Sequence, residues 1–304
     1  DFNNIIKKTN FNFILGNPPW KRGAYENSLF LHYIKERKKR ESSKADGKPQ
    51  ITVSNKEIAQ AFLLRTSDFS TTQTRCALLV TSKTLYNLNA VKFRKYFLHN
   101  YFINKVFELA PVRKEVFDRS NDPSIAPAAI LFFHYAHSEA TDKNVIEHIA
   151  LKPNRFFSLF KVFMLQRNDY KQVVQGRLIT YDWLWKTLVY GSYMDFNFLK
   201  RLKEGYETFS NIINTDDSFS VGEGVIIGIN GHYKVDNYID KPFIDTHKKH
   251  LSPFFIYFDP MSKWKHLFVH RRRKDEIFSP PALLVTRGVD NNFKANSAIL
   301  YKEA

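Results

Sequence analysis

Cysteine is almost absent from this sequence, which has only Cys76 among its 304 residues. A single thiol excludes an internal disulfide framework, so a reducing cytoplasm is the simplest setting. No apolar run is long enough to span a bilayer and no secretory leader is visible, so we expect a cytoplasmic protein without a membrane partner. The chain starts at Asp1, shortly before its most informative motif, and we expect it to be a piece of a longer polypeptide.

Several catalytic signatures are also missing. No Gly-rich loop with a following Lys-Ser or Lys-Thr comes after an apolar strand, which argues against a nucleotide hydrolase. No serine nucleophile elbow is present. The pairs His247 and His250, and His266 and His270, have spacings that suit a metal on a helix, but further ligands do not accompany them. We therefore expect no metal site.

Acidic residues are scarce relative to basic ones: 30 Asp and Glu stand against 46 Lys and Arg, which gives a formal net charge of +16. The excess is spread along the chain, with 23 basic and 14 acidic residues in 1–150, and 23 and 16 in 151–304. Counterion release makes phosphate contacts a main source of nonspecific affinity, so both halves are candidates to bind nucleic acid. Ribosomal association or solubility alone would also suit a basic chain.

The most informative stretch is Phe11–Trp20, an apolar run followed by Asn-Pro-Pro-Trp. It predicts a short buried strand that stops at four residues, Asn17, Pro18, Pro19 and Trp20. This tetrapeptide resembles the catalytic motif of the amino-group DNA methyltransferases, in which Asp, Asn or Ser precedes Pro-Pro and then Tyr, Phe or Trp. The alternative is a strand-ending turn with a core tryptophan.

The resemblance implies a role for each residue of the motif. The exocyclic nitrogen of adenine or cytosine is a poor nucleophile because its lone pair is delocalised into the ring. The side-chain oxygen of Asn17 and the carbonyl oxygen of Pro18 would accept the two amino hydrogens, which directs the lone pair toward an electrophile. Pro19 would hold the turn, and Trp20 would offer a face on which a flipped base stacks.

Helices and strands alternate after the motif. The pattern predicts helices at Asn27–Lys39, from Ser54 toward Phe69 with a Ser54–Glu57 capping box, and at Lys92–Asn100. It predicts strands at Thr74–Thr81, which reads as buried on both faces, at Ile103–Leu109 and at Pro127–Phe133. This alternation is typical of a mostly parallel α/β sheet, whose ligands bind at the carboxyl ends of strands, where the motif lies.

The run from Phe11 to about Tyr135 is similar to the catalytic half of an N6-adenine methyltransferase. In that family a Phe ahead of the last strand covers the other face of the flipped adenine, and Phe117 is the matching position. The sequence departs from the family pattern by a longer spacer, Asp118–Ala126. An ordinary core position is the alternative for Phe117.

The second half of the chain changes character. Asp182–Leu202 predicts helices with aromatic packing, and the runs around Asn230-Gly231 predict a hairpin. The densest basic cluster of the chain is interleaved with Trp264 and Phe268, and a later predicted strand ends on an arginine. The DNA-binding candidates from the cluster are Lys263, Lys265, Arg271, Arg272, Arg273 and Lys274, and the candidate from the strand end is Arg287. This arrangement resembles the target-recognition domain of fused restriction-modification enzymes; a basic solvated surface is the alternative.

The Gly-rich run Phe219–Gly224 is a candidate for a cofactor loop. Such a loop must open into a helix, whereas a hairpin pattern follows Gly224. The resemblance therefore implies that the half that binds S-adenosylmethionine lies upstream of Asp1.

Together these observations predict an α/β fold. Residues 1–150 are expected to be the C-terminal half of a methyltransferase-type doubly wound sheet, and residues 151–304 a helical connector with a mixed α+β target-recognition region. The predicted function is site-specific adenine-N6 methylation of double-stranded DNA, with S-adenosylmethionine as the methyl donor. The protein would be of the restriction-modification type, and a nuclease domain would be expected in the same or a partner polypeptide. Alternatives are methylation of RNA or of a protein glutamine amide, and a DNA-binding module without catalysis.

Overall fold

The computed structural model describes residues 11–20, 28–42, 50–54, 57–117, 126–137, 139–216, 218–227, 233–244, 251–252, 254–257, 263–286 and 297–300. The chain forms two compact units, unit 1 (Asp1–Leu202) and unit 2 (Lys203–Ala304). This boundary differs from the one expected at residue 150, because the strands at 145–150 and 170–174 pair in one sheet.

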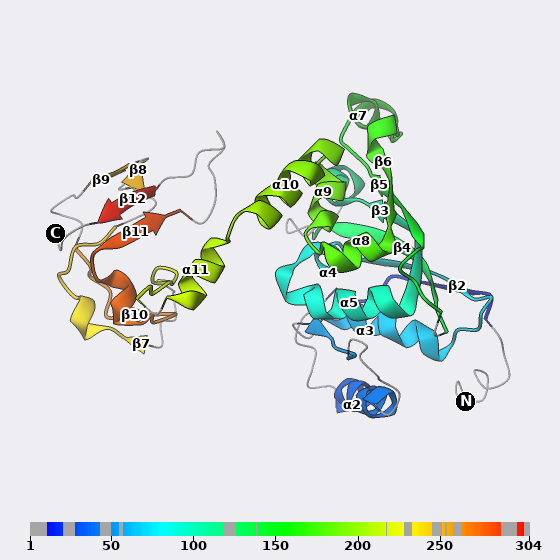
Figure 1. The fold of residues 1–304 in the computed structure, drawn as a ribbon, viewed down its shortest axis with the longest axis horizontal. Helices are drawn as coiled ribbons and strands as arrows, with labels where there is room; N and C mark the ends of the chain where they lie inside the picture. The colour runs from blue at the N-terminus through cyan, green and yellow to red at the C-terminus, as the bar shows by residue number, and fades with distance from the viewer. Residues whose placement is uncertain are drawn as a thin grey trace. The chain divides into compact units, whose positions relative to one another are not determined.

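The described residues of unit 1 form a six-stranded sheet with the order β1–β2–β4–β3–β5–β6 (Figure 1). Its strands are β1 (Phe13–Gly16), β2 (Arg75–Thr81), β3 (Tyr101–Glu108), β4 (Ala128–Tyr135), β5 (Val145–Ala150) and β6 (Tyr170–Val174). β1, β2, β3 and β5 run in one direction, and β4 lies antiparallel between β2 and β3. The sheet is therefore mixed, and the prediction of a mostly parallel sheet is wrong, since three of its five pairings are antiparallel.

The helices among the described residues of unit 1 are α2 (Ser28–Ser42), α3 (Ile58–Arg65), α4 (Lys83–Tyr86), α5 (Val91–Asn100), α6 (Arg113–Val116), α7 (Arg155–Phe160), α8 (Gln175–Thr180), α9 (Leu184–Tyr190) and α10 (Tyr193–Gly205), which continues into unit 2. The predicted capping box does not form: α3 begins at Ile58, and Glu57 at its N-cap makes no side-chain cap bond. The N–H of Ser54 instead donates to the Gln60 side chain at 2.7 Å. The expected aromatic packing is confirmed by the stacked rings of Trp183 and Phe196, 5.5 Å apart.

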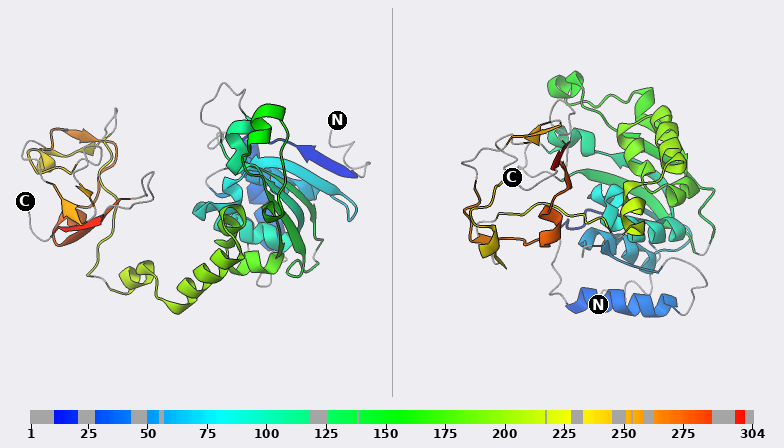
Figure 2. Two further views of the ribbon diagram at one scale, coloured as in Figure 1. Left: turned by 90° about the horizontal axis from the view of Figure 1, so that it is seen from above. Right: turned by 60° about the vertical axis from the view of Figure 1, so that its left-hand side comes forward.

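Helices α3, α4, α5, α8 and α9 cover one face of the sheet (Figures 1 and 2). Strand side chains alternate between the two faces, and in β2 the residues Cys76, Leu78 and Val80 are buried. The intervening residues of β2 are only half-buried, so the prediction that this strand is buried on both faces is wrong. The less covered face is apolar at β1, where Phe13 and Leu15 are 70% and 74% exposed, so the prediction that the strand before the motif is buried is wrong.

The core lies between the covered face and these helices. The rings of Phe97 and Tyr101 stack with centroids 4.4 Å apart, which joins α5 to the start of β3. Gln175 at the start of α8 is wholly buried. Its side chain donates to the carbonyl oxygens of Leu98 and Tyr101 and accepts from the N–H of Ile103. α5, α8 and β3 are thus held together by both apolar packing and satisfied hydrogen bonds.

Unit 2 contains α11 (Phe209–Thr215) and three short antiparallel pairs among its described residues: β7 (Tyr233–Lys234) with β10 (Phe268–Val269), β8 (Leu251–Ser252) with β9 (Phe255–Ile256), and β11 (Ala282–Val285) with β12 (Ser297–Leu300). The turn of the hairpin predicted at Asn230-Gly231 lies outside the described residues. A small core surrounds Trp264, which is 3% exposed and packs with Val235 and Val269. The indole is therefore part of the fold of unit 2 and not an exposed neighbour of the basic residues.

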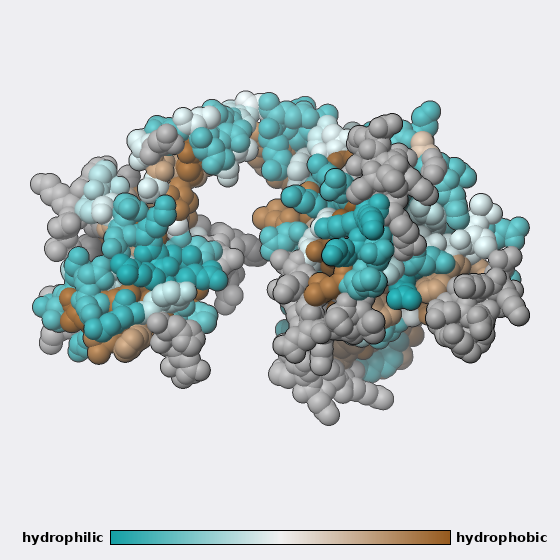
Figure 3. All heavy atoms as spheres, turned by 90° about the horizontal axis from the view of Figure 1, so that it is seen from below, coloured by the Kyte–Doolittle hydropathy of each residue, from teal (hydrophilic) through white to brown (hydrophobic). Residues whose placement is uncertain are grey.

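The surface of the chain is mixed in character. On the face shown in Figure 3, hydrophobic patches lie scattered between hydrophilic residues. Within the described parts of the chain, no helix is both long enough and apolar enough to cross a membrane.

Candidate active site

The Asn-Pro-Pro-Trp motif begins where β1 leaves the sheet. The β1–β2 register ends at the pair Gly16 and Leu78. A Cβ at residue 16 would lie 3.2 Å from Leu78 Cδ2, so glycine permits the close approach of the two strands here. Beyond it, Pro18 is buried while Asn17 and Pro19 are exposed. The carboxyl ends of β1, β2, β3 and β5 share this edge, which is where α/β sheets bind their ligands.

The indole of Trp20 hydrogen-bonds to β2 just beyond the last residue pair of β1 and β2. The N–H of Arg75 donates to the carbonyl of Asn12, so the backbone groups of Arg75 face β1. Every second residue of a strand directs its N–H and C=O to the same neighbouring strand, and the carbonyl of Leu79 in β2 therefore also faces the β1 side. β1 has ended at this level, and Trp20 Nε1 donates to Leu79 O at 3.2 Å. This bond satisfies a carbonyl group that the sheet leaves without a partner strand, and it sets the orientation of the indole.

Phe117 lies beside Trp20, as the wider resemblance leads one to expect. The ring centroids are 6.3 Å apart with the planes at 88°, an edge-to-face contact. Both rings pack against one apolar cluster, formed by Leu109, Val112, Ala128, Ile149 and Leu151. A base held between two rings needs parallel faces, so in this arrangement a base can stack on only one of them. Phe117 is the C-cap of the short helix α6.

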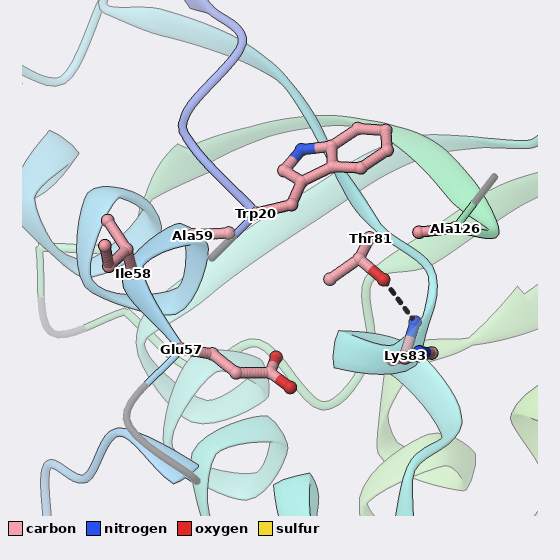
Figure 4. A pocket seen from close by; sticks show the side chains of 7 residues that line it. All are labelled: Trp20, Glu57, Ile58, Ala59, Thr81, Lys83 and Ala126. Carbon is pink, nitrogen blue, oxygen red and sulfur yellow. Dashed lines mark hydrogen bonds between the residues drawn. The ribbon is translucent and has the colours of Figure 1, made fainter. Parts of the chain in front are cut away.

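A recess of about 50 Å³ lies beside Trp20 (Figure 4). It is lined by Trp20, Glu57, Ile58, Ala59, Thr81, Lys83 and Ala126. Figure 4 shows the indole on one side and the Glu57 carboxylate pointing toward the turn that carries Lys83. Pockets for small ligands measure roughly 300–1,000 Å³, so this recess is one wall of a site and not a complete ligand pocket.

The polar groups of the recess come from α3 and from the turn after β2. Glu57 is 6% exposed, and its Oε2 accepts from Gln60 Nε2 at 3.3 Å. The backbone N–H of Lys83 donates to Thr81 Oγ1 at 3.4 Å. Carboxylate, hydroxyl and ammonium groups together offer a ligand both acceptors and donors. No motif in the sequence marks Glu57, Thr81 or Lys83 as site residues, although the position of Thr81 and Lys83 at the carboxyl end of a predicted strand is a signal for them.

The buried carboxyl group of Glu108 hydrogen-bonds to Ser82, in the turn between Thr81 and Lys83. Glu108 ends β3, and its Oε1 accepts from Ser82 Oγ and from the N–H of Ala110, the latter at 2.9 Å. Burial raises the pKa of Glu108 from 4.5 to about 7, against the opposing effect of these two hydrogen bonds. Burial also raises the pKa of Tyr86, with a further contribution from the charge of Glu108. Glu108 therefore fixes Ser82, and with it the turn between Thr81 and Lys83.

S-adenosylmethionine, the cofactor that the motif implies, does not fit the described residues. The recess beside Trp20 has only about 50 Å³. The Gly-rich run Phe219–Gly224 lies in unit 2, and the described residues that follow it are not helical. A Cβ at Gly222 would lie 2.7 Å from Ile277 Cδ1, so the space at this glycine is filled by a side chain of unit 2.

The predicted DNA-binding residues are mostly exposed on unit 2. Lys263, Lys265, Arg271, Arg272 and Lys274 are exposed. Arg273 is half-buried, and its Nη2 lies 2.7 Å from Glu223 Oε2, so this cation is already paired within the fold. Arg287 lies outside the described residues, as do His247 and His250. His266 and His270 are exposed, and no group of three or more metal-ligating side chains is found in the described part of the chain.

Residues 1–117 match the model of the Eco57I restriction-modification methylase family. The matched segment contains the motif strand β1, the Asn-Pro-Pro-Trp residues, the turn after β2, and Phe117 at its end. No curated protein matches the chain.

Several solved structures resemble the chain at low identity. The modification subunit of a putative type I restriction enzyme from Vibrio vulnificus YJ016 aligns with 15% identity and a TM-score of 0.34, over 56% of this chain and 35% of that protein. The methyltransferase subunit of a type I restriction-modification system from Streptococcus thermophilus aligns with 15% identity and a TM-score of 0.37, over 58% and 37%. The type IIG restriction endonuclease BpuSI aligns with 13% identity and a TM-score of 0.41, over 64% and 22%. The chain thus spans about a third of the length of the first two proteins.

Proposed function

We propose that this chain is the catalytic half, together with a DNA-recognition region, of a restriction-modification-type DNA adenine-N6 methyltransferase. The observation that carries the proposal is the position of Asn17–Trp20 at the carboxyl end of β1, inside the segment that matches the Eco57I methylase family. Donors and acceptors from α3 and from the turn after β2 border the same place.

The motif residues have different roles: Asn17 and Pro18 bind the target amino group, and Trp20 stacks on the base. The exposed side-chain oxygen of Asn17 and the carbonyl oxygen of Pro18 accept its two hydrogens, so that the nitrogen lone pair points away from the ring plane. The indole of Trp20, held by Leu79, provides the face on which the flipped base stacks. Phe117 covers the other face of the flipped base once its ring has left the edge-to-face contact with Trp20.

S-adenosylmethionine supplies the methyl group in this proposal, bound by a half of the protein upstream of Asp1. Two features of unit 1 support an additional layer there. Among the described strands β1 is the edge of the sheet, and its side chains Phe13 and Leu15 are 70% and 74% exposed. An exposed edge with apolar side chains is a surface that proteins normally cover.

Double-stranded DNA is the proposed substrate because the chain carries a formal charge of +16 and unit 2 exposes a basic cluster. The candidates for groove and phosphate contacts are Lys263, Lys265, Arg271, Arg272 and Lys274, with Arg287 as a further candidate from the sequence. Arg273 and Arg272 are weaker candidates, since Arg273 Nη2 lies 2.7 Å from Glu223 Oε2 and Arg272 Nη2 lies 3.6 Å from Asp275 Oδ2. A nuclease in the same or a partner polypeptide and a cytoplasmic location complete the proposal.

The test is Asn17→Ala in the complete protein, including the upstream region, with Asn89→Ala as a control at another exposed asparagine. Transfer of labelled methyl groups to unmethylated DNA should fall at least about 100-fold for Asn17→Ala, the usual cost of removing one such polar group, and stay unchanged for the control. DNA binding should be unchanged in both. Retained methyl transfer by Asn17→Ala would refute the assignment.

The identity of the substrate needs a separate measurement. Duplex DNA, RNA and a glutamine-containing peptide should be offered in competition, with the methylated product identified by mass spectrometry. N6-methyladenine in DNA is the expected product. A protein that binds DNA but does not bind S-adenosylmethionine, even with its upstream region, would instead be a DNA-binding module without catalysis.

A further inference from the structure

The segment around α7 combines exposed apolar side chains with an uninterrupted positive charge. Between Lys152 and Arg167 the sequence has four basic residues, the other two being Arg155 and Lys161, and no acidic residue. All four are exposed. The same segment exposes Phe156, Leu159, Phe160, Val162 and Leu165, by 52%, 75%, 65%, 55% and 57%. Exposed apolar groups of this extent on one short segment indicate a binding surface.

This surface adjoins the candidate active site. Phe163 packs against the same apolar cluster as Trp20 and Phe117. The ring of Phe157 stacks on Phe163 with centroids 4.2 Å apart and planes at 19°. In both views of Figure 2, α7 lies beside the short turquoise helix α6, whose C-cap is Phe117. The buried side of the α7 segment is therefore continuous with the aromatic pair of the site.

The exposed side chains project from an anchored support. Asn154 caps the helix, because its side chain accepts from the N–H of Phe157 at 2.9 Å. Phe157 is 8% exposed and holds α7 onto unit 1. The helix ends at Lys161, which adopts the left-handed conformation with φ of 57°. A capping box between Gln166 and Asp169 then fixes the return of the chain to β6. The segment is thus held at both ends while its apolar side chains face outward.

Charge and side-chain type favour a polynucleotide over a protein as the partner. Lys152 Nζ lies 3.4 Å from Asp169 Oδ1, whereas Arg155, Lys161 and Arg167 lie in a run of sequence that contains no carboxylate. Three cations in such a run suit a polyanion, and mixed charges would be expected on a surface that binds a protein. Phe and Leu are among the residues that insert between base steps in DNA-deforming proteins. A base that leaves the stack for Trp20 would open a space in the duplex close to this segment.

We propose that the α7 segment is a DNA wedge, in which Arg155 and Lys161 contact phosphates while Leu159 and Phe160 fill the space that the flipped base leaves in the duplex. The inference rests on the proposed function, since it takes duplex DNA as the substrate and Trp20 as the receiver of the base.

The apolar part of the proposal is tested with the double variant Leu159→Ala/Phe160→Ala. Fluorescence anisotropy of labelled duplexes, one fully paired and one with a single abasic site, measures binding by the complete protein, including the upstream region. Removing side chains that fill the gap should weaken binding to the abasic duplex roughly tenfold, as expected for the loss of one stacking contact, and leave the paired duplex little changed. The control Val145→Ala/Met194→Ala removes side chains that are 49% and 75% exposed, at the start of β5 and in α10, and should change neither affinity.

The ionic part is tested with Arg155→Ala/Lys161→Ala against Lys92→Ala/Lys95→Ala, two exposed cations of α5. Loss of two phosphate contacts should lower the slope of log affinity against log salt by about 1.8, while the α5 control keeps the wild-type slope. Circular dichroism melts check that every variant folds.

The outcomes separate this inference from the proposed function. A complete wild-type protein that does not bind duplex DNA would overturn both. A complete wild-type protein that binds DNA, with both α7 variants binding like it, would overturn the wedge alone. Equal losses on paired and abasic duplexes would refute gap filling, and a preference for RNA over both duplexes would refute DNA as the occupant.

Discussion

His148 and Glu108 are two buried ionisable groups whose pKa values move in opposite directions. The β3–β5 register pairs Val106 with His148 and Glu108 with Ala150, so both side chains lie on the same face of neighbouring strands. Both are fully buried, and neither ring nitrogen of His148 has a hydrogen-bond partner among the described residues. Burial, with a smaller effect of the Lys171 charge, lowers the pKa of His148 from 6.5 to about 3. Burial raises the pKa of Glu108 from 4.5 to about 7.

The two shifts affect stability with opposite signs. Between pH 6.5 and about 3 the folded state binds one proton fewer at His148 than the unfolded state, so the free energy of unfolding falls as the pH falls. Between pH 7 and 4.5 it binds one proton more at Glu108, so the free energy of unfolding rises as the pH falls. Each effect amounts to about 1.4 kcal/mol per pH unit. From pH 6.5 to 4.5 they oppose one another, and below pH 4.5 the His148 effect acts alone.

Urea unfolding at several pH values, followed by tryptophan fluorescence, measures the two contributions. In His148→Leu the loss of stability on acidification should be smaller than in the wild type, with the difference growing by about 1.4 kcal/mol per unit below pH 6.5. Glu108→Gln, which keeps the acceptor for Ser82, should lose the opposing gain between pH 7 and 4.5. Stability curves of His148→Leu and the wild type that stay parallel from pH 7 to 4 would refute the reasoning.

Three further predictions concern packing and the site. Gln175→Leu removes the side-chain partner of the Ile103 N–H and of the Tyr101 carbonyl, while the Leu98 carbonyl still accepts from Thr141 Oγ1. The free energy of unfolding should therefore fall by at least about 2 kcal/mol in urea titrations; an unchanged midpoint would contradict this. Arg94→Met breaks a two-bond ion pair with Asp182 and should cost about 2–3 kcal/mol by the same measurement, less than a fully buried pair because the Asp182 side chain is 24% exposed. Trp20→Phe keeps an aromatic face but loses the donor to Leu79, so methyl transfer by the complete protein should fall less than in Trp20→Ala; equal losses would show that the indole N–H matters more than stacking.

Local patterns in the sequence identified most elements of unit 1. The apolar runs predicted strands that the structure places at β2, β3 and β4 with shifts of a few residues, and helical spacing predicted α2 and α5. The motif position also follows from local chemistry, because Pro18 and Pro19 cannot extend a sheet and a strand must end there. The α/β class and the location of Asn17 at the carboxyl end of a strand therefore follow from the sequence alone.

Local sequence patterns do not predict the order of the strands in the sheet. β4 has the same apolar composition as its neighbours, and nothing in its residues distinguishes an antiparallel insertion between β2 and β3 from a parallel addition. The same holds for burial: β2 is as apolar as a strand covered on both sides, yet one of its faces is half-exposed. Such differences depend on which distant segments pack against a strand.

By itself the sequence determined the motif, its place after a strand and the basic charge of the chain, because these depend on residue type and spacing alone. The tertiary structure decided which groups join the motif: the bond from Trp20 to Leu79, the edge-to-face contact with Phe117, and the carboxyl groups of Glu57 and Glu108 near the turn after β2. These partners are far apart in the chain, and only the pairing of strands and the packing of α3 bring them together. Side-chain neighbours and burial set pKa values and hydrogen bonds, so the chemistry of the site followed from the fold.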